Sequence, residues 1–204
     1  MSNSIEDLLA APLGLRERKK LKTRRAIRAA AFRLFAEQGY DATTIDQISA
    51  EADVSPSTFF RYFPTKEDLV VTDDYDPLME AALRARPAGE PLLDSVRAAI
   101  LPALRMLMDS EHDDMLLRIT LLRNNPVIRA RSVTDAACTK EMLIGVLTER
   151  ATGPVDELRM RSRVAAVLAA TGEAIDYWGE HEGEDDIAVL VERSLDALAA
   201  GFED

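Results

Sequence analysis

The chain has 204 residues, 47% of them hydrophobic, which is enough for one small module and a larger domain with its own core. This composition excludes wholesale disorder, and no apolar run approaches the length of a membrane-spanning helix. The single cysteine, Cys138, permits no internal disulfide. With an opening segment that is acidic and lacks an export pattern, these features predict a cytoplasmic protein.

The net charge of −11 is unevenly divided along the chain. Residues 16–66 carry eleven Lys/Arg and six Asp/Glu, a balance of +5, whereas residues 1–15 carry −2 and residues 67–204 carry −14. A base-rich end can meet DNA phosphates while the acidic remainder is repelled by them. The same acidity argues against binding to an anionic membrane surface.

Residues 1–15 are expected to form a flexible arm. A first helix is predicted from Arg16 to Gln38, with Gly39 just past its end. Its apolar stripe comprises Ile27, Ala30, Ala31, Leu34 and Phe35.

Two short helices joined by a tight turn are predicted between residues 44 and 63. Thr44 and Gln47 have the spacing of a capping box, and Asp53-Val54 interrupts the pattern. Ser55 can cap the second helix, because Pro56 then occupies the first helical position, where no backbone donor is needed. Phe59 and Phe63, four residues apart, are expected to share its inward face.

The outward face of this second helix can lie in a DNA major groove. Arg61 would then reach a guanine edge, while Phe60 or Thr58 would touch a thymine methyl group. The alternative is a surface helix in which the TFFRYF run is only core and rim, or a strand, since Thr, Phe and Tyr favour strands. Pro56 and Pro64 leave room for about two helical turns, which favours a helix.

The stretch TTIDQISAEADVSPSTFFRYFPTKEDL, preceded by AIRAAAFRLFAEQGYDATT, resembles the DNA-binding domain of the tetracycline-repressor (TetR) family of one-component bacterial regulators. The resemblance covers roughly Arg16 to Leu69, departing mildly at Ser57, where the family often has Gly, and at Phe60, where it often has Tyr. It implies a helix-turn-helix domain over residues 16–66 and a ligand-binding and dimerisation domain over 67–204. The DNA-binding residues it implies are Thr44, Ser55, Ser57, Thr58, Phe60, Arg61, Tyr62 and Lys66. The RERKKLKTRR cluster (residues 16–25) is then best interpreted as a nonspecific phosphate contact, although such runs are usually solvated faces.

The rest of the chain has helical periodicity almost throughout, which predicts an all-α fold. A helix capped by Thr65 is expected to bend at Pro77, and a later helix is expected to be interrupted at Pro102. The further predicted segments are a linker (86–91), an apolar stretch (115–122), and helices at 127–150, 156–180 and 184–200.

The last two predicted helices carry small and apolar residues on matching sides. Ala165, Ala169 and Gly172 permit close approach, and the final helix presents a stripe that includes Leu190 and Leu195. Two such helices can form a four-helix bundle with a second copy, or they can pack only within one chain. The TetR resemblance implies the first arrangement, a homodimer that binds a double-stranded, inverted-repeat DNA operator.

A small-molecule effector, mostly apolar or amphipathic, is expected in the C-terminal domain. The candidate ligand-binding residues are Met106, Met115, Arg118, Met142 and Trp178. Methionines suit adaptable pockets but fill ordinary cores more often, and a buried arginine needs an acid partner or an anionic ligand. Residues 75–100 also loosely resemble a TetR subgroup whose C-terminal domain is associated with acyl-CoA-like ligands.

No catalytic or metal-binding pattern occurs in the sequence. His112, His181 and Cys138 lack metal-ligand spacing, and neither a nucleophile motif nor a phosphate-binding glycine loop is present. We therefore expect no catalytic residue, metal or cofactor. The leading hypothesis is a ligand-released, homodimeric repressor, and the alternative is an all-helical small-molecule-binding protein or enzyme without specific DNA binding.

Overall fold

The computed structural model describes residues 14–72 and 75–201 and divides the chain into two compact units. Unit 1 comprises Met1–Asp74 and Thr120–Ser132, and unit 2 comprises Tyr75–Ile119 and Val133–Asp204. Unit 1 thus extends beyond residue 66 and takes in a second segment from the middle of the chain. The expected arm over residues 1–15 lies outside the described residues except for its last two positions.

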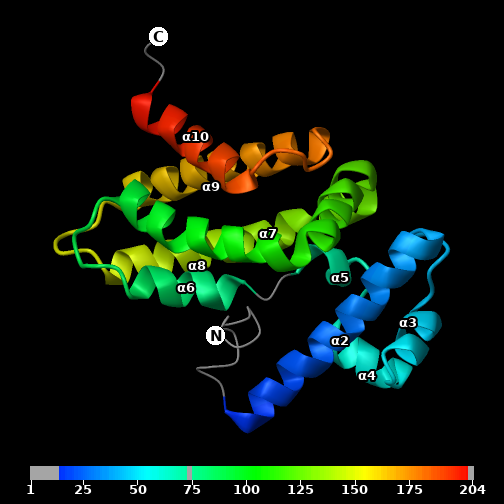
Figure 1. Ribbon diagram of the computed structural model, residues 1–204. Coiled ribbons are helices and arrows are strands. Elements are labelled where there is room, and N and C mark those ends of the chain that lie inside the picture. The colour runs from blue at the N-terminus through cyan, green and yellow to red at the C-terminus, as the bar shows by residue number, and fades with distance from the viewer. Residues whose placement is uncertain (1–13, 73–74, 202–204) are drawn as a thin grey trace. The chain divides into compact units, whose positions relative to one another are not determined.

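Residues 14–72 form one long helix and several short ones (Figure 1). These are α2 (Leu15–Gln38), α3 (Ile45–Glu51), α4 (Pro56–Tyr62) and α5 (Asp68–Val71). Helix α2 ends as predicted at Gly39, whose φ of 86° is readily adopted only by glycine. Its buried face contains Phe32 in addition to the predicted stripe, whereas Leu34 is only half-buried.

The helix predicted to start at Thr65 and bend at Pro77 is broken in two. Thr72 has an extended conformation (ψ 142°), and α6 (Asp76–Arg84) begins afresh with Pro77 in its first turn. In a continuous helix the proline ring would clash with the carbonyl four residues earlier, whereas in a first turn its missing N–H costs nothing. The prediction of one bent helix was therefore wrong.

Pro102, unlike Pro77, lies inside a continuous helix. Helix α7 (Leu92–Asn124) continues through Pro102, and its irregular residue is Glu111, with φ −136° and ψ 27°. Pro102 is exposed, so the carbonyl of Ala98 that loses its helical donor can be hydrated instead. The predicted interruption at Pro102 was wrong, and the kink is at Glu111, whose carboxylate hydrogen-bonds the Tyr75 hydroxyl.

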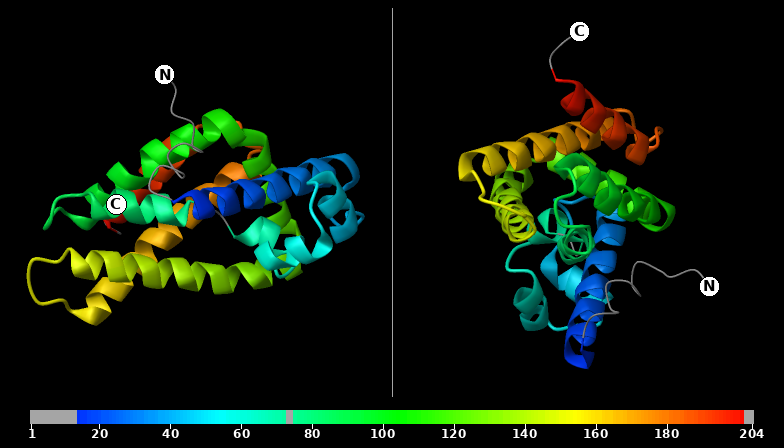
Figure 2. Two further views of the ribbon diagram at one scale, coloured as in Figure 1. Left: turned by 90° about the horizontal axis from the view of Figure 1, so that it is seen from below. Right: turned by 90° about the vertical axis from the view of Figure 1, so that its left-hand side faces the viewer.

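The remaining helices begin within three residues of the predicted starts at 127, 156 and 184. They are α8 (Pro126–Glu149), α9 (Glu157–Glu180) and α10 (Ile187–Ala200). Asn125 Oδ1 accepts from the backbone N of Val127 at 2.9 Å, and Asp156 and Asp186 cap α9 and α10. Helices α9 and α10 pack against each other and lie side by side in Figure 1 and in the right-hand view of Figure 2.

One hydrophobic cluster in the core of unit 2 consists of aliphatic side chains. Its buried cluster consists of Leu83, Ala99, Leu143, Val146, Leu147 and Val164, which come from α6, α7, α8 and α9. Burial of such side chains at roughly 25 cal/mol per Å² is the main stabilising contribution to a helical unit. No strand occurs in the described part of the chain, so the all-α prediction is confirmed. None of the described helices is long and apolar enough to cross a membrane.

His112 on α7 contacts Trp178, the only tryptophan of the chain, and the turn between α9 and α10. The His112 ring lies 5.4 Å from the Trp178 ring, edge to face, and its Nε2 is 3.2 Å from the carbonyl oxygen of Gly183. Hydrogen bonds to Asp113 and to this carbonyl raise the pKa of His112 above its ordinary value of 6.5.

We expect Trp178 fluorescence to change with a midpoint above pH 6.5, because the imidazolium that contacts the indole forms there. Because the pKa of His112 is higher in the folded than in the unfolded protein, protonated His112 stabilises the folded state. This contribution is fully present below about pH 6.5 and is lost as the pH rises through the pKa of His112 in the folded protein. A fluorescence titration checks this. His112→Gln should abolish the transition, whereas His181→Gln should retain it, since His181 stacks on Tyr177.

Candidate nucleic-acid interface and ligand cavity

Helices α3 and α4 form a helix-turn-helix whose local geometry follows the predicted caps. Thr44 Oγ1 accepts from Gln47 N at 3.2 Å, and the Gln47 side chain accepts from Thr44 N at 2.8 Å, completing the capping box. Ser55 Oγ accepts from Thr58 N at 3.1 Å. The turn between the helices holds Asp53 in the left-handed region, with φ 53°, where Asp is tolerated better than bulkier residues.

The inward face of α4 is locked against α2. Phe59 and Phe63 are both completely buried, as predicted. The guanidinium of Arg24 lies 4.6 Å from the centroid of the Phe63 ring and donates to Thr72 Oγ1 at 2.6 Å. Arg28 donates to the Thr72 carbonyl at 2.7 Å. These contacts fix both the end of α4 and the chain that follows it.

The outward face of α4 brings most of the predicted DNA-binding residues together. Phe60 is 50% exposed, and Arg61 is exposed with its guanidinium 5.4 Å from the Tyr62 ring. The Ser57 and Thr58 hydroxyl oxygens lie 2.9 and 3.0 Å from Ser55 Oγ. An arginine fork, an apolar ring and hydroxyl groups on one short helix are the groups that can contact base edges in a major groove.

Lys66 occupies a different environment from the other predicted residues. Its Nζ donates to the carbonyl oxygens of Tyr40 at 2.8 Å and Thr43 at 3.0 Å, and it lies 4.1 Å from the centroid of the Tyr40 ring. Two of its three donors are thus used to hold the α2–α3 connection. Tyr40 in turn donates to Glu67 Oε1 at 3.1 Å, and burial together with that carboxylate raises the pKa of Tyr40.

We expect Lys66→Ala to lower the free energy of unfolding of the helix-turn-helix unit. Two charge-assisted hydrogen bonds to backbone carbonyls are lost, and a hydrogen bond to a charged group is worth about 1.5–3 kcal/mol. Chemical denaturation followed by circular dichroism measures the loss.

Lys22→Ala is the matched control, because Lys22 is exposed on α2 and no ion pair or hydrogen bond of its side chain occurs in the described residues. This variant should leave stability unchanged and reduce the salt dependence of DNA binding by about one phosphate contact. Equal stability of both variants and the parent would mean that Lys66 has no structural role.

The first half of α2 supplies a second basic surface. Its exposed cations are Arg16, Arg18, Lys19, Lys20 and Lys22. Lys20 pairs with Glu17 at 3.0 Å in an exposed contact of the kind that contributes little to stability. This surface can contact phosphates without reading sequence.

The predicted ligand-binding residues lie in several environments. Met142 packs against the aliphatic core, and Trp178 is buried, with its Nε1 donating to the Asp185 carbonyl at 2.9 Å. Met106, Met115 and Arg118 are half-buried, and Arg118 already has an interaction within the protein. The assignment of these five residues to a ligand site stays a prediction.

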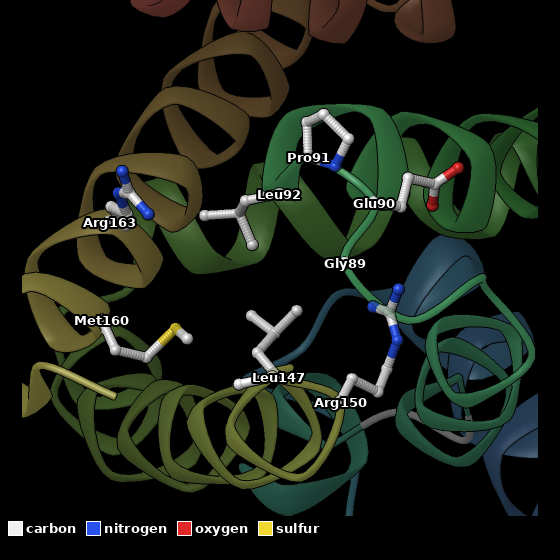
Figure 3. Close-up of a pocket in the computed structure, with 9 residues that line it drawn as sticks. Gly89, Glu90, Pro91, Leu92, Leu147, Arg150, Met160 and Arg163 are labelled. Atoms are coloured by element: carbon white, nitrogen blue, oxygen red, sulfur yellow. The ribbon is translucent and has the colours of Figure 1, made fainter. Parts of the chain in front are cut away.

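A cavity of about 260 Å³ lies elsewhere in unit 2, and none of those five residues lines it (Figure 3). Its lining comes from the α6–α7 loop, the start of α7, the end of α8 and the start of α9. The lining residues are Gly89, Glu90, Pro91, Leu92, Leu147, Arg150, Ala151, Met160 and Arg163. Sequence patterns did not indicate this site, because its residues come from the ends of four segments.

No group of three or more His, Cys, Asp or Glu side chains that could hold a metal ion occurs within residues 14–72 and 75–201.

Comparison with known proteins places most of the chain in two family models. The model "Bacterial regulatory proteins, tetR family" matches residues 27–71, which contain the second half of α2 together with α3, α4 and α5. The model "MftR C-terminal domain" matches residues 90–203.

Individual relatives match over nearly the whole length. The HTH-type transcriptional regulator TcmR of Streptomyces glaucescens is 30% identical over 195 residues, covering 91% of this chain and 86% of the relative. Among solved structures, FadR of Bacillus subtilis in complex with stearoyl-CoA superposes with a TM-score of 0.59 at 21% identity, covering 88% of this chain and 99% of that one. Thermus thermophilus FadR in complex with lauroyl-CoA gives a TM-score of 0.57 at 24% identity, covering 89% and 95%.

Proposed function

Because this chain belongs to the TetR family of bacterial regulatory proteins, we propose that it represses transcription by binding an inverted-repeat operator as a homodimer and that a small ligand releases it. Family membership makes it a DNA-binding transcriptional regulator. Repression, the dimer and the ligand are the further parts of the proposal. The observation that carries it is the outward face of α4, where Phe60 and Arg61 are exposed on a helix whose inward face is locked to α2.

Operator recognition should depend on Arg61 more than on any other side chain of α4. A bidentate arginine–guanine contact discriminates against a wrong base pair by about 1–3 kcal/mol, so Arg61→Ala should weaken specific binding by that amount and relax one base position per half-site. A gel-shift titration against the chain's own upstream region, repeated with single-base variants of the site, measures both effects. Unchanged base preference in Arg61→Ala would assign the reading role to another residue.

Lys22→Ala serves again as the comparison. Loss of a phosphate contact should weaken all DNA sequences alike, whereas loss of a base contact should weaken only the operator. The ratio of operator affinity to nonspecific affinity, at one stated salt concentration, therefore separates the two variants. If no specific fragment is found for the parent protein, the small-molecule-binding alternative becomes the better account.

The proposed dimer uses the outer faces of α9 and α10. Tyr177 is 43% exposed, and Val189, Ala169 and Ala197 are exposed at helical spacing. A groove of about 250 Å³ between the helices is lined by Glu173, Ala174, Tyr177, Leu190, Arg193 and Ser194.

An isologous interface brings each surface patch against its own copy. Glu173 can then meet Arg193 of the partner subunit, and neither side chain makes an ion pair within the described part of the protomer. A dimer of this kind would place two α4 helices for successive major grooves, about 34–36 Å apart.

The proposed effector is an apolar or amphipathic molecule bound in unit 2. The two FadR structures contain acyl-CoA ligands, which supports the same ligand class here. If the ligand favours a dimer that cannot bind the operator, ligand and DNA must weaken each other by the same factor, typically about 1–3 kcal/mol of coupling. Arg118→Leu tests whether Arg118 contacts an acidic effector: unchanged release of the variant by that effector would make Arg118 a structural residue.

A further inference from the structure

The cavity in Figure 3 combines an apolar floor with cationic walls. Leu92, Leu147 and Met160 project into the space between the start of α7, the end of α8 and the start of α9. Arg150 and Arg163 stand on opposite sides of these apolar side chains. Ligand sites commonly have such a lining, a mostly apolar surface with a few polar groups that fix orientation.

The one acidic residue of the lining, Glu90, is already paired with an arginine. Glu90 Oε2 accepts from Arg86 Nε at 2.9 Å and from Ser95 Oγ at 2.6 Å. In Figure 3 its carboxylate points away from the apolar side chains. These contacts hold the pKa of Glu90 at about 2, so the carboxylate stays ionised and paired with Arg86 at any physiological pH. No acidic residue of the lining is therefore left to balance the positive charges of Arg150 and Arg163.

The two arginines differ in how far they are already engaged. Arg150 donates to the Pro87 carbonyl at 2.8 Å and to Ser95 Oγ at 3.1 Å, which fixes it as part of the wall, while its Nε is buried without an acceptor. Arg163 is exposed at the rim and makes no ion pair or side-chain hydrogen bond with any described residue. A free guanidinium beside an apolar cavity can pair bidentately with a carboxylate.

We propose that this cavity binds a short amphipathic carboxylate, whose charged end pairs with Arg163 and whose apolar body packs on Leu92, Leu147 and Met160. Arg150 stands on the opposite side of these apolar side chains and already donates to the Pro87 carbonyl and to Ser95 Oγ, so it belongs to the wall and is not the partner of the carboxylate. This assignment rests on the proposed function, in which unit 2 takes an effector, and it names the class of that effector. It also places the charged end beside residues 150–163 rather than beside Arg118.

Octanoate and octanamide are suitable probes, because they share one apolar chain and differ only in the charged group. Isothermal titration of the full-length protein should give octanoate an affinity about tenfold higher than octanamide, the lower end of what a charge-assisted hydrogen bond at an exposed site provides. Arg163→Gln should remove this preference, and Arg163→Lys should retain part of it. Circular dichroism confirms that each variant is folded.

Arg159→Gln is the matched control. Arg159 is exposed one turn earlier on α9, its side chain has no partner in the described residues, and it does not line the cavity. This variant should bind both probes as the parent does. The proposal is overturned if the parent binds neither probe, if it binds both equally, or if Arg163→Gln keeps the preference for octanoate.

Operator binding of the unliganded protein is measured in parallel. A protein that binds its operator but shows no dependence of octanoate binding on Arg163 overturns the cavity assignment alone. A protein that binds octanoate through Arg163 but binds no operator supports the cavity and overturns the proposed function.

Discussion

Leu195→Asp is expected to unfold unit 2 rather than only to separate two protomers. Leu195 lies on α10, and its side chain is 0% exposed within a single protomer. Removing a buried leucine costs about 2–5 kcal/mol, and leaving a carboxylate in its place adds the penalty of an unpaired buried charge. The sum approaches the whole stability of a typical domain, about 5–15 kcal/mol.

The sequence pattern left open whether the stripe with Leu195 packs within one chain or against a second copy, and the TetR resemblance implied the second arrangement. In the structure its stripe is used inside the protomer, where α10 packs on α9 and Ser194 Oγ donates to the Ala170 carbonyl at 2.7 Å. An insoluble Leu195→Asp protein, or one without a cooperative thermal transition, is thus the expected result. It would carry no information about the dimer.

Ala197→Asp is the variant that tests the dimer. Ala197 is exposed on α10, one turn after the groove residue Arg193. We expect this variant to keep the thermal transition of the parent and to sediment as a monomer, because only the proposed interface receives the charge. A folded Ala197→Asp protein that sediments as an unchanged dimer would move the interface away from α9 and α10. A Leu195→Asp protein as stable as the parent would contradict its buried position.

Local signals in the sequence predicted the helix ends well. The capping box at Thr44 and the cap at Ser55 followed by Pro56 both depend on residues within four positions of one another. Such hydrogen bonds form wherever the chain turns into a helix, whatever packs around it. For the same reason the outward face of α4 could be read from spacing alone.

Effects that depend on distant residues were not predictable in this way. Lys66 was predicted as a DNA-binding residue, which stays a prediction, whereas its ammonium also binds carbonyls 26 and 23 residues earlier in the chain. Pro77 and Pro102 have the same local chemistry, yet one stands at a helix start and the other within a helix. Both prolines are exposed, so neither the residue type nor its exposure decides which of the two outcomes occurs.

The ligand cavity was also not predictable from local sequence patterns. Arg150 and Arg163 stand at the end of one helix and near the start of the next, outside any periodic pattern. One of the methionines predicted to bind the ligand, Met142, packs on the aliphatic core. Met is a common core filler, so its frequency in a segment is a weak guide to a ligand site.

The second large effect is expected at Asp68, a carboxylate that is 1% exposed in unit 1. Asp68 Oδ2 accepts from Thr65 N and Thr65 Oγ1, both at 2.9 Å, which closes the turn after α4. Its other oxygen accepts from Arg131 Nε at 2.8 Å. Arg131 lies on the first part of α8, within the segment Thr120–Ser132 that belongs to unit 1.

Arg131→Met should lower the free energy of unfolding of unit 1 by about 3 kcal/mol. Breaking a buried ion pair by removing one partner costs about 3–5 kcal/mol, because the remaining charge is left uncompensated. The lower end applies here, since the Arg131 side chain is 41% exposed. Arg129→Gln, two residues earlier on the same helix, removes an exposed charge and an exposed hydrogen bond to the Arg123 carbonyl, and it should cost less than about 1.5 kcal/mol.

A double-mutant cycle with Asp68→Asn isolates the pair. The two single variants and the double variant should not be additive, with a coupling of about 0.5–3 kcal/mol, because both single changes remove one shared contact. Operator affinity is measured on the same four proteins. The Asp68 turn directly follows α4, so the variants that lose the pair should bind DNA more weakly even at temperatures where unit 1 remains folded. Additive stabilities together with unchanged operator affinity would show that the segment 120–132 does not help to position the recognition helix.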